Sequence, residues 1–262
     1  MEFFSEKKMS RSELEHDRLA YMQSNIDTRF AMDKKYDYIC VWDKYAENGM
    51  LDNQYFVQDI WGARKVFEHK PEVHYDVGSS VAGFVAHLLS MKQKVKLIDI
   101  RPMENNLDTL FLNSGGGVIY HQSDATHLDN IESQSIQSLS ALCSVEHFGL
   151  GRYGDPIDPM AWEKALKSFQ RVLASGGRLY FSVPIGRINK VCFNAHRVYT
   201  PQIIIDTLND MDIIEMSYVN GFDTVTCIER IDDVVYTCEK NLDSIPDILN
   251  NGTTGLFEFR KK

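Results

Sequence analysis

The 262-residue sequence has few cysteines, and they lie far apart. A disulfide framework needs an even number of cysteines at regular spacing, and a structural zinc site needs closely spaced pairs of ligands. This chain has an odd number and no C-x-x-C pair. We therefore expect reduced thiols and no metal site at the five cysteines, which are Cys40, Cys143, Cys192, Cys227 and Cys238.

Long apolar runs are also missing. No stretch approaches the roughly 20 apolar residues that a membrane-spanning helix needs. Residues 1–18 alternate charges of both signs and lack the apolar centre of a secretory signal. We therefore expect a protein without a membrane segment, located in the cytoplasm.

The sequence also lacks an excess of positive charge. The chain has 37 acidic and 28 basic residues, a formal net charge of −9. Proteins that bind nucleic acid nonspecifically concentrate Lys and Arg on their surface. We therefore expect a small-molecule partner rather than nucleic acid, and one or two arginines can still hold an anionic ligand. A homodimer is left open.

The chain divides into two patterns. Residues 1–70 place apolar residues mostly at helical spacing, which predicts an N-terminal helical cap. From residue 71, short apolar runs alternate with helical stretches, which is typical of βαβ units and an α/β domain over residues 71–262. We predict strands at 73–77, 94–100, 117–124, 135–144, 177–184, 212–219 and 233–239. We predict helices at 81–91, 159–173 and 201–209, with a glycine turn at 175–177 ending the second of them.

Carboxylates stand at the ends of three predicted strands. Asp76 and Gly78 close the first strand, Asp99 closes the second, and Asp124 closes the third. In an open parallel sheet, ligands bind beyond the carboxyl ends of the strands. Asp99 lies about twenty residues after Gly78, the spacing at which a carboxylate reaches a ribose diol.

The dinucleotide fingerprint G-x-G-x-x-G lacks its second glycine here, because Ser80 stands in that position. The smaller space disfavours a pyrophosphate and a nicotinamide-dependent oxidoreductase. We expect Asp76 to bind an ammonium, Asp99 a ribose and Asp124 an adenine amine. This combination favours S-adenosylmethionine as the ligand.

Four motifs resemble those of class I S-adenosylmethionine-dependent methyltransferases: DVGSS (76–80), LIDIRP (97–102), QSDATHL (122–128) and VLASGGRLYFSVP (172–184). LCSVEHF (142–148) is similar to the leucine-glutamate-histidine signature of the branch that methylates small molecules. The resemblance implies a Rossmann-like, mostly parallel sheet flanked by helices, with the last strand antiparallel. The predicted cofactor-binding residues are Asp76, Gly78, Ser79, Ser80, Asp99, Ile100, Arg101, Asp124, Ala125 and Cys143.

A narrower resemblance is carried by GFVAHLLS (83–90), SLSALCSVEHFGLGRYGDPIDP (138–159) and FNAHRVYTP (193–201). These segments are similar to a family of unknown function found in bacterial surface-polysaccharide gene clusters. That context implies O-methylation of a sugar or nucleotide sugar. The sequence departs from its relatives at residues 80–82, where an arginine and an acidic residue are expected.

Two histidines are candidates for the base that takes the proton of an acceptor hydroxyl. His147 follows the fourth strand and His196 follows the fifth, so both are placed near the ligand edge of the sheet. Each is also compatible with a packing or loop role. The predicted acceptor-binding residues are Glu146, Arg152, Tyr153, Asp155, Asn194, Arg197 and Tyr199. A cation held by Asp155, Asp158 and His147 is disfavoured, since no ligand spacing supports it.

Two alternatives stay open at this point. One is methylation of a nitrogen or carboxylate of a small metabolite, for which a general base matters less. The other is a noncatalytic module that binds the cofactor without turnover.

Overall fold

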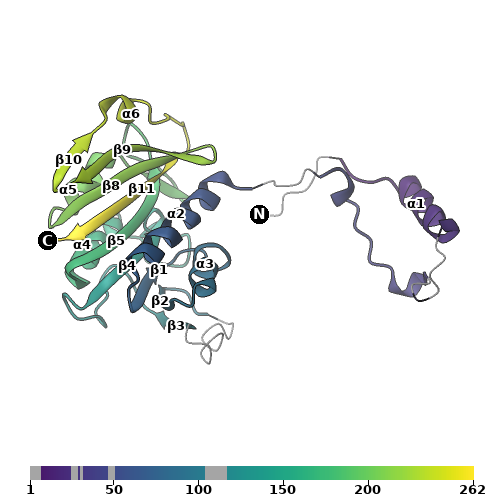
Figure 1. Cartoon of the computed structure of the whole chain (residues 1–262), viewed down its shortest axis with the longest axis horizontal. Helices are drawn as coiled ribbons and strands as arrows, with labels where there is room; N and C mark the ends of the chain where they lie inside the picture. Colours follow the sequence, from purple (N-terminus) through teal and green to yellow (C-terminus); the bar gives the residue numbers. More distant parts are fainter. Residues whose placement is uncertain (1–6, 25–28, 30–31, 47–50, 104–116) are drawn as a thin grey trace. The chain divides into compact units, whose positions relative to one another are not determined.

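The computed structural model describes residues 7–24, 29, 32–46, 51–103 and 117–262 (Figure 1). The chain forms two compact units, Met1–Asp52 and Asn53–Lys262. This division precedes the predicted boundary between residues 70 and 71. The reason is that α2 (Asn53–His69) packs within the second unit and buries one face there.

The first unit contains α1 (Arg11–Ser24), η2 (Lys34–Tyr36) and η3 (Asp43–Tyr45). Ser10 and Glu13 form a capping box at the start of α1: the Ser10 amide donates to Glu13 Oε2 (2.8 Å) and the Glu13 amide donates to Ser10 Oγ (3.2 Å). None of its described residues is buried. Polar contacts such as the Arg18–Asp37 ion pair (2.6 Å) connect its parts. The helical cap as a functional element stays a prediction.

The second unit is built on one mixed sheet with the strand order β10-β9-β8-β11-β5-β4-β1-β2-β3 (Figure 1). Strands β1 to β5 pair in parallel, and β11 lies antiparallel between β5 and β8. The predicted sheet with parallel strands and flanking helices is therefore confirmed, but antiparallel pairing is not limited to the last strand, because β8, β9, β10 and β11 all pair antiparallel. The strands are β1 (Val73–Val77), β2 (Lys94–Asp99), β3 (Gly117–Gln122), β4 (Ile136–Leu142), β5 (Leu173–Ile185), β8 (Met211–Asn220), β9 (Asp223–Ile231), β10 (Val234–Thr237) and β11 (Thr253–Lys261).

The structure differs from the predicted pattern in several unpredicted strands and at the end of one helix. β9, β11 and the hairpin of β6 (Lys190–Cys192) and β7 (His196–Val198) were not predicted. Helix α4 (Ala161–Val172) ends earlier, and β5 begins at the next residue. Gly176 therefore does not end the helix; it has a left-handed φ of 76° inside β5, close to an irregularity in the pairing with β4.

Adjacent residues of the central strands point to opposite faces of the sheet. On one face, Val95 and Leu97 pack with residues of α2, η4 (Val81–Val85) and α3 (Ala86–Ser90). On the other, Ile98 belongs to the core that contains α4 and α5 (Pro201–Thr207). A short α6 (Glu239–Asp243) precedes β11. No helix of the described part is both long and apolar enough to cross a membrane.

The strand order predicts where on this sheet a ligand binds. β1 has β2 on one side and β4 on the other. The strand order therefore reverses beside β1, and a crevice opens there at the carboxyl ends of the parallel strands.

Candidate active site

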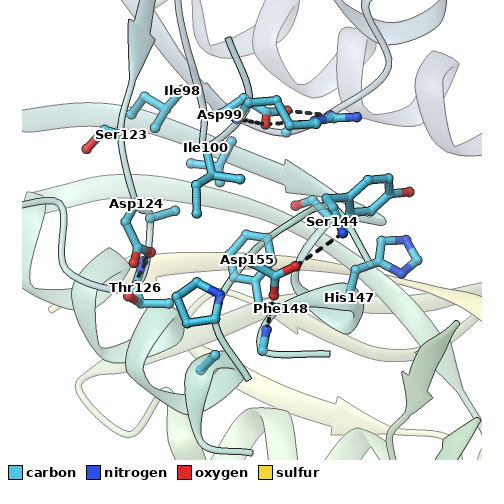
Figure 2. A pocket seen from close by; sticks show the side chains of 18 of the residues that line it. Ile98, Asp99, Ile100, Ser123, Asp124, Thr126, Ser144, His147, Phe148 and Asp155 are labelled. Carbon is cyan, nitrogen blue, oxygen red and sulfur yellow. Dashed lines mark hydrogen bonds and ion pairs between the residues drawn. The ribbon is translucent and has the colours of Figure 1, made fainter. Parts of the chain in front are cut away.

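A cavity of about 240 Å³ lies at the carboxyl ends of β1, β2, β3 and β4 (Figure 2). Its walls come from the segments that follow these four strands, as well as from the loop before α4. The predicted site residues that line it are Gly78, Asp99, Ile100, Arg101, Asp124, Ala125, Cys143, His147, Tyr153 and Asp155. The predicted residues outside its lining are Asp76, Ser79, Ser80, Glu146, Arg152, Asn194, His196, Arg197 and Tyr199.

Gly78 sets the shape of the cavity floor. Its φ of 67° lies in the left-handed region, which glycine adopts without strain. A Cβ at this position would lie 3.1 Å from Ser144 Cβ and 3.9 Å from Asp99 Oδ2. The absent side chain therefore lets the ends of β1, β2 and β4 come together around one space.

Asp99 stands at the end of β2, as predicted, and lines the cavity (Figure 2). Arg101 holds its carboxylate. The Arg101 amide and Nε each donate to Oδ1 (2.9 Å), and Nη2 donates to Oδ2 (2.5 Å). The Arg101 guanidinium also lies over the Tyr153 ring, 4.7 Å from its centre. Arg101 thus links the Asp99 wall to the loop before α4.

Asp124 follows β3 and folds back on its own turn. Oδ1 accepts hydrogen bonds from the Thr126 amide (2.8 Å) and from Thr126 Oγ1 (2.7 Å), and Figure 2 shows the pair in the cavity wall. Oδ2 makes no hydrogen bond to a described residue. One oxygen therefore holds the turn, and the other is available to a ligand.

Asp76 has a different environment from the one its sequence position suggests. It is fully buried, and its carboxylate accepts from Ser79 Oγ (2.6 Å), the Ser79 amide (3.1 Å) and Ser140 Oγ. Burial raises its pKa to about 6. Ser79 Oγ in turn accepts from the Leu142 amide (3.1 Å). In this conformation Asp76 and Ser79 hold the turn that follows β1 against β4, and Asp76 has no exposed surface for an ammonium.

Ser80 starts the next element rather than facing the cavity. Its side chain accepts from the Gly83 amide (3.2 Å) and caps η4. The predicted helix at 81–91 consequently begins with a π-helical turn before α3. The serine that replaces the second fingerprint glycine thus has a local structural role.

His147 is neutral and held in one tautomer. Its Nδ1 lies 2.6 Å from the Ala195 carbonyl oxygen, a distance that requires Nδ1 to donate. Nε2 therefore carries the lone pair, and it lies 3.5 Å from Glu146 Oε1. Burial lowers the pKa of His147 to about 4, despite the opposing effect of the Ala195 carbonyl. At neutral pH the ring is therefore unprotonated at Nε2.

Glu146 is also uncharged. Only 2% of the residue is exposed, and burial raises its pKa to about 8. Its Oε2 is buried and makes no hydrogen bond to a described residue. The same holds for three other polar atoms of the segments around it, which are Ser144 Oγ, His196 Nε2 and Tyr199 Oη. A buried polar atom without a hydrogen bond destabilises the fold, so a group of four such atoms indicates that a ligand or water binds there.

The segments after β4 and around β7 are held together. Arg197 is buried and donates through Nη1 to the Phe148 carbonyl (2.5 Å) and through Nη2 to the Pro159 carbonyl (3.4 Å). Asn194 is exposed in the turn between β6 and β7. Both lie close to His147 in the fold through Ala195 and Phe148, but outside the cavity wall.

Several contributors were not predicted. Ser144, Thr126, His127 and Phe148 line the cavity, and each stands within a few residues of a predicted strand end, so the strand-end rule points to them. Gln58 is different: it accepts from Ser182 Oγ (2.7 Å), which accepts from the Cys143 amide (3.0 Å). Gln58 comes from α2, and nothing in the sequence links it to the site.

Metal-ligand clusters are not part of this arrangement. Across the described ranges, no group of three or more His, Cys, Asp or Glu side chains is placed to hold an ion.

The chain is similar to known proteins at two levels. Residues 121–245 match the model of a family described as "Caenorhabditis protein of unknown function, DUF268". This description includes no gene cluster, so the polysaccharide context does not follow from it. No curated protein matches the chain.

Among solved structures, the chain is similar to the 1,6-didemethyltoxoflavin-N1-methyltransferase of Burkholderia thailandensis, solved with S-adenosylhomocysteine bound. The identity is 15%, the match covers 79% of each chain, and the TM-score is 0.53. It is also similar to the N-methyltransferase NodS of Bradyrhizobium japonicum, at 13% identity over 80% of this chain and 98% of that one, with a TM-score of 0.50.

A third similar structure is the [4+2]-cyclase SpnF, at 13% identity over 78% of this chain and 81% of that one, with a TM-score of 0.51. The same fold therefore carries more than one reaction. The chain has the Rossmann-like fold shared by class I S-adenosylmethionine-dependent methyltransferases.

Proposed function

We propose that this protein transfers a methyl group from S-adenosylmethionine to a hydroxyl of a small polar acceptor. The observation that carries the proposal is the cavity at the strand ends, in which Gly78 leaves room on the floor and two carboxylates, Asp99 and Asp124, stand in the walls. Its support is chemical: these groups match the hydrogen-bonding needs of one nucleoside with an amino-acid tail.

Each part of the cofactor, the ribose, the adenine and the amino-acid tail, has residues in the cavity that suit it. Asp99 at the end of β2 accepts the hydrogen bonds of a ribose diol, and Arg101 shares the carboxylate with it. The free Oδ2 of Asp124 accepts from an exocyclic adenine amine. The floor at Gly78 and Ser144 takes the amino-acid tail, with Ser144 Oγ as an unpaired polar group there.

When bound, the cofactor supplies an activated methyl group on a sulfonium. The chain then has to position the acceptor oxygen and take its proton. His147 suits this role, because it is neutral, lines the cavity and keeps the lone pair on Nε2. His196 is the second candidate: burial lowers its pKa, and its Nε2 has no hydrogen bond to a described residue.

We propose a sugar or nucleotide sugar as the acceptor, in the biosynthesis of a surface polysaccharide. The resemblance of residues 83–90, 138–159 and 193–201 to a family from such gene clusters motivates this proposal. The unsatisfied polar atoms at residues 144–146 and 196–199 also suit an acceptor rich in hydroxyls.

The test is a turnover assay. The full chain is incubated with S-adenosylmethionine and a panel of nucleotide sugars, small amines and small carboxylates, and products are detected by mass spectrometry. We expect one acceptor to gain a single methyl group, and His147→Gln or His196→Gln to lower kcat by about 100-fold or more. Cofactor binding without turnover on any acceptor would instead indicate a noncatalytic module. Turnover on amine or carboxylate acceptors that survives both histidine variants would replace the hydroxyl acceptor.

A further inference from the structure

Arg152 stands where the loop after β4 meets the hairpin of β6 and β7. Its Nη1 donates to the Ala195 carbonyl (3.0 Å) and lies 3.2 Å from His147 Nδ1. Its guanidinium lies over the Tyr153 ring, 5.1 Å from the ring centre. One corner of the guanidinium is thus anchored beside the candidate base, on the same carbonyl that fixes the His147 tautomer.

The rest of this guanidinium is not used by the fold. Among the described residues, no carboxylate pairs with Arg152, and neither Nε nor Nη2 makes a hydrogen bond. Arg197 provides the contrast, because it is buried and both of its Nη atoms bind main-chain carbonyls. Arg197 ties two loops together, whereas Arg152 keeps the paired donors with which a guanidinium binds an oxyanion.

The surroundings do not compensate the charge of Arg152. Burial raises the pKa of Glu146 to about 8 and lowers that of His147 to about 4, so both are uncharged at neutral pH, and burial also lowers the pKa of His196. Within the loop, the Asp155 carboxylate accepts from the amides of Gly149 (2.6 Å) and Tyr153 (3.2 Å). The other nearby carboxylate, Asp99, is held by Arg101. In a chain of net charge −9, a guanidinium beside the candidate base that has no counterion among the described residues indicates a place for an anionic ligand.

We propose that the acceptor carries an oxyanion, a phosphate or a carboxylate, and that Arg152 binds this group next to His147. The proposal rests on the proposed function and narrows its substrate class. The anchored guanidinium fixes one end of the acceptor, so that a hydroxyl elsewhere on the same molecule is presented to the cavity. An acceptor with only neutral hydroxyls leaves the Arg152 donors without a counterion.

The test measures oxyanion binding by isothermal titration of the full chain saturated with S-adenosylhomocysteine. Inorganic pyrophosphate and malonate are the probes, so the two arms distinguish phosphate from carboxylate. We expect Arg152→Gln to weaken binding of the preferred probe about 10- to 100-fold. Arg64→Gln is the matched control, because it removes the same charge from an exposed position on α2 outside the cavity lining. Equal weakening by both variants, or no binding of either probe, would overturn the proposal.

A second comparison separates the acceptor from the carboxylate of the cofactor itself. S-adenosylhomocysteine has an amino-acid carboxylate, and methylthioadenosine lacks it. Arg152→Gln is expected to leave the affinities for both nucleosides unchanged. A loss confined to S-adenosylhomocysteine would show that Arg152 holds the cofactor tail, and would overturn the acceptor assignment. If the wild-type chain binds neither nucleoside but still binds pyrophosphate through Arg152, the oxyanion site stands and the proposed cofactor fails.

Discussion

Gly78 is the residue at which backbone conformation and cavity shape depend on each other. Its left-handed φ is strained for any residue with a side chain, and the 3.1 Å approach of Ser144 Cβ leaves little room for one. Gly78→Ala is therefore expected to cost about 1–2 kcal/mol of stability and to weaken S-adenosylhomocysteine binding at least about tenfold. Thermal unfolding and calorimetric titration measure the two effects.

Gly176→Ala is the control for this substitution. Gly176 is also left-handed, with a φ of 76°, but a Cβ there meets no atom within 4 Å. The control is expected to show the strain without the loss of binding. Equal binding losses in the two variants would remove the role given to Gly78 in the cavity floor.

Glu146 predicts a pH dependence of stability. Its pKa in the folded state, about 8, lies above the ordinary value of 4.5. The folded chain therefore holds a proton that the unfolded chain loses, and the free energy of unfolding falls as pH rises from about 4.5 to 8. His147 and His74, with pKa values lowered to about 4 and 3, act in the opposite direction, but only below about 6.5.

The window between pH 6.5 and 8 isolates the carboxyl group from these histidines. There we expect the urea-unfolding free energy of the wild-type chain to fall by about 1.5–2 kcal/mol, and Glu146→Gln to remove that slope. The raised pKa values of Asp59 and Asp76, both about 6, end below this window. A slope that persists in Glu146→Gln would show that another group carries it.

At the residue scale, strand-end positions could be predicted and burial could not. Asp99 and Asp124 stand in the cavity wall as predicted, since a residue that ends a parallel strand must emerge at the ligand edge. Asp76 differs in two respects: β1 continues one residue beyond it, to Val77, and Ser79 and Ser140 surround its carboxylate. That environment arises from contacts between β1 and β4, which local sequence does not encode.

At the scale of elements, α2 and the turn that starts η4 are packed closely. A Cβ at Gly83 would lie 2.0 Å from Asp59 Oδ2, and Asp59 is buried on α2. Gly83→Ala is expected to destabilise the chain by about 1–3 kcal/mol, measured by chemical unfolding.

A double-mutant cycle tests the cause. Asp59→Ala shortens the side chain that meets the new methyl group, so the penalty of Gly83→Ala is expected to shrink in that background. A penalty that stays the same with Asp59→Ala would place the strain elsewhere in the turn.

The strands that the sequence did not predict share one physical feature: they lack the hydrophobic alternation of a half-buried strand. β11 pairs on both sides with strands distant in the chain, β5 and β8, and all but one of its residues are buried. β9 is the opposite case, because only Cys227 and Ile228 of its nine residues are buried. Neither shows the alternating pattern of a half-buried strand, whereas the first strands, between helical stretches, follow the βαβ pattern.

At the scale of the whole molecule, the buried core and the cavity lie within Asn53–Lys262. A chain of residues 53–262 is therefore expected to unfold cooperatively, with a Tm close to that of the full chain. Calorimetry of the two chains checks this. Loss of cooperative unfolding would show that residues 1–52 are required by the fold.

The same truncation tests the predicted cap. S-adenosylhomocysteine affinity within about threefold of the full chain is expected if residues 1–52 take no part in cofactor binding. A loss of more than about tenfold, with Tm unchanged, would instead assign the first unit a role in covering the bound cofactor.

The most direct test of the central claim is calorimetric titration of the full chain with S-adenosylhomocysteine, repeated on Asp99→Asn and on Asp223→Asn as a control at the β8–β9 turn. The account predicts binding with a Kd on the order of micromolar, lost in Asp99→Asn and kept in the control. No binding to the wild-type chain, or equal binding to Asp99→Asn, would contradict the claim that this cavity holds S-adenosylmethionine.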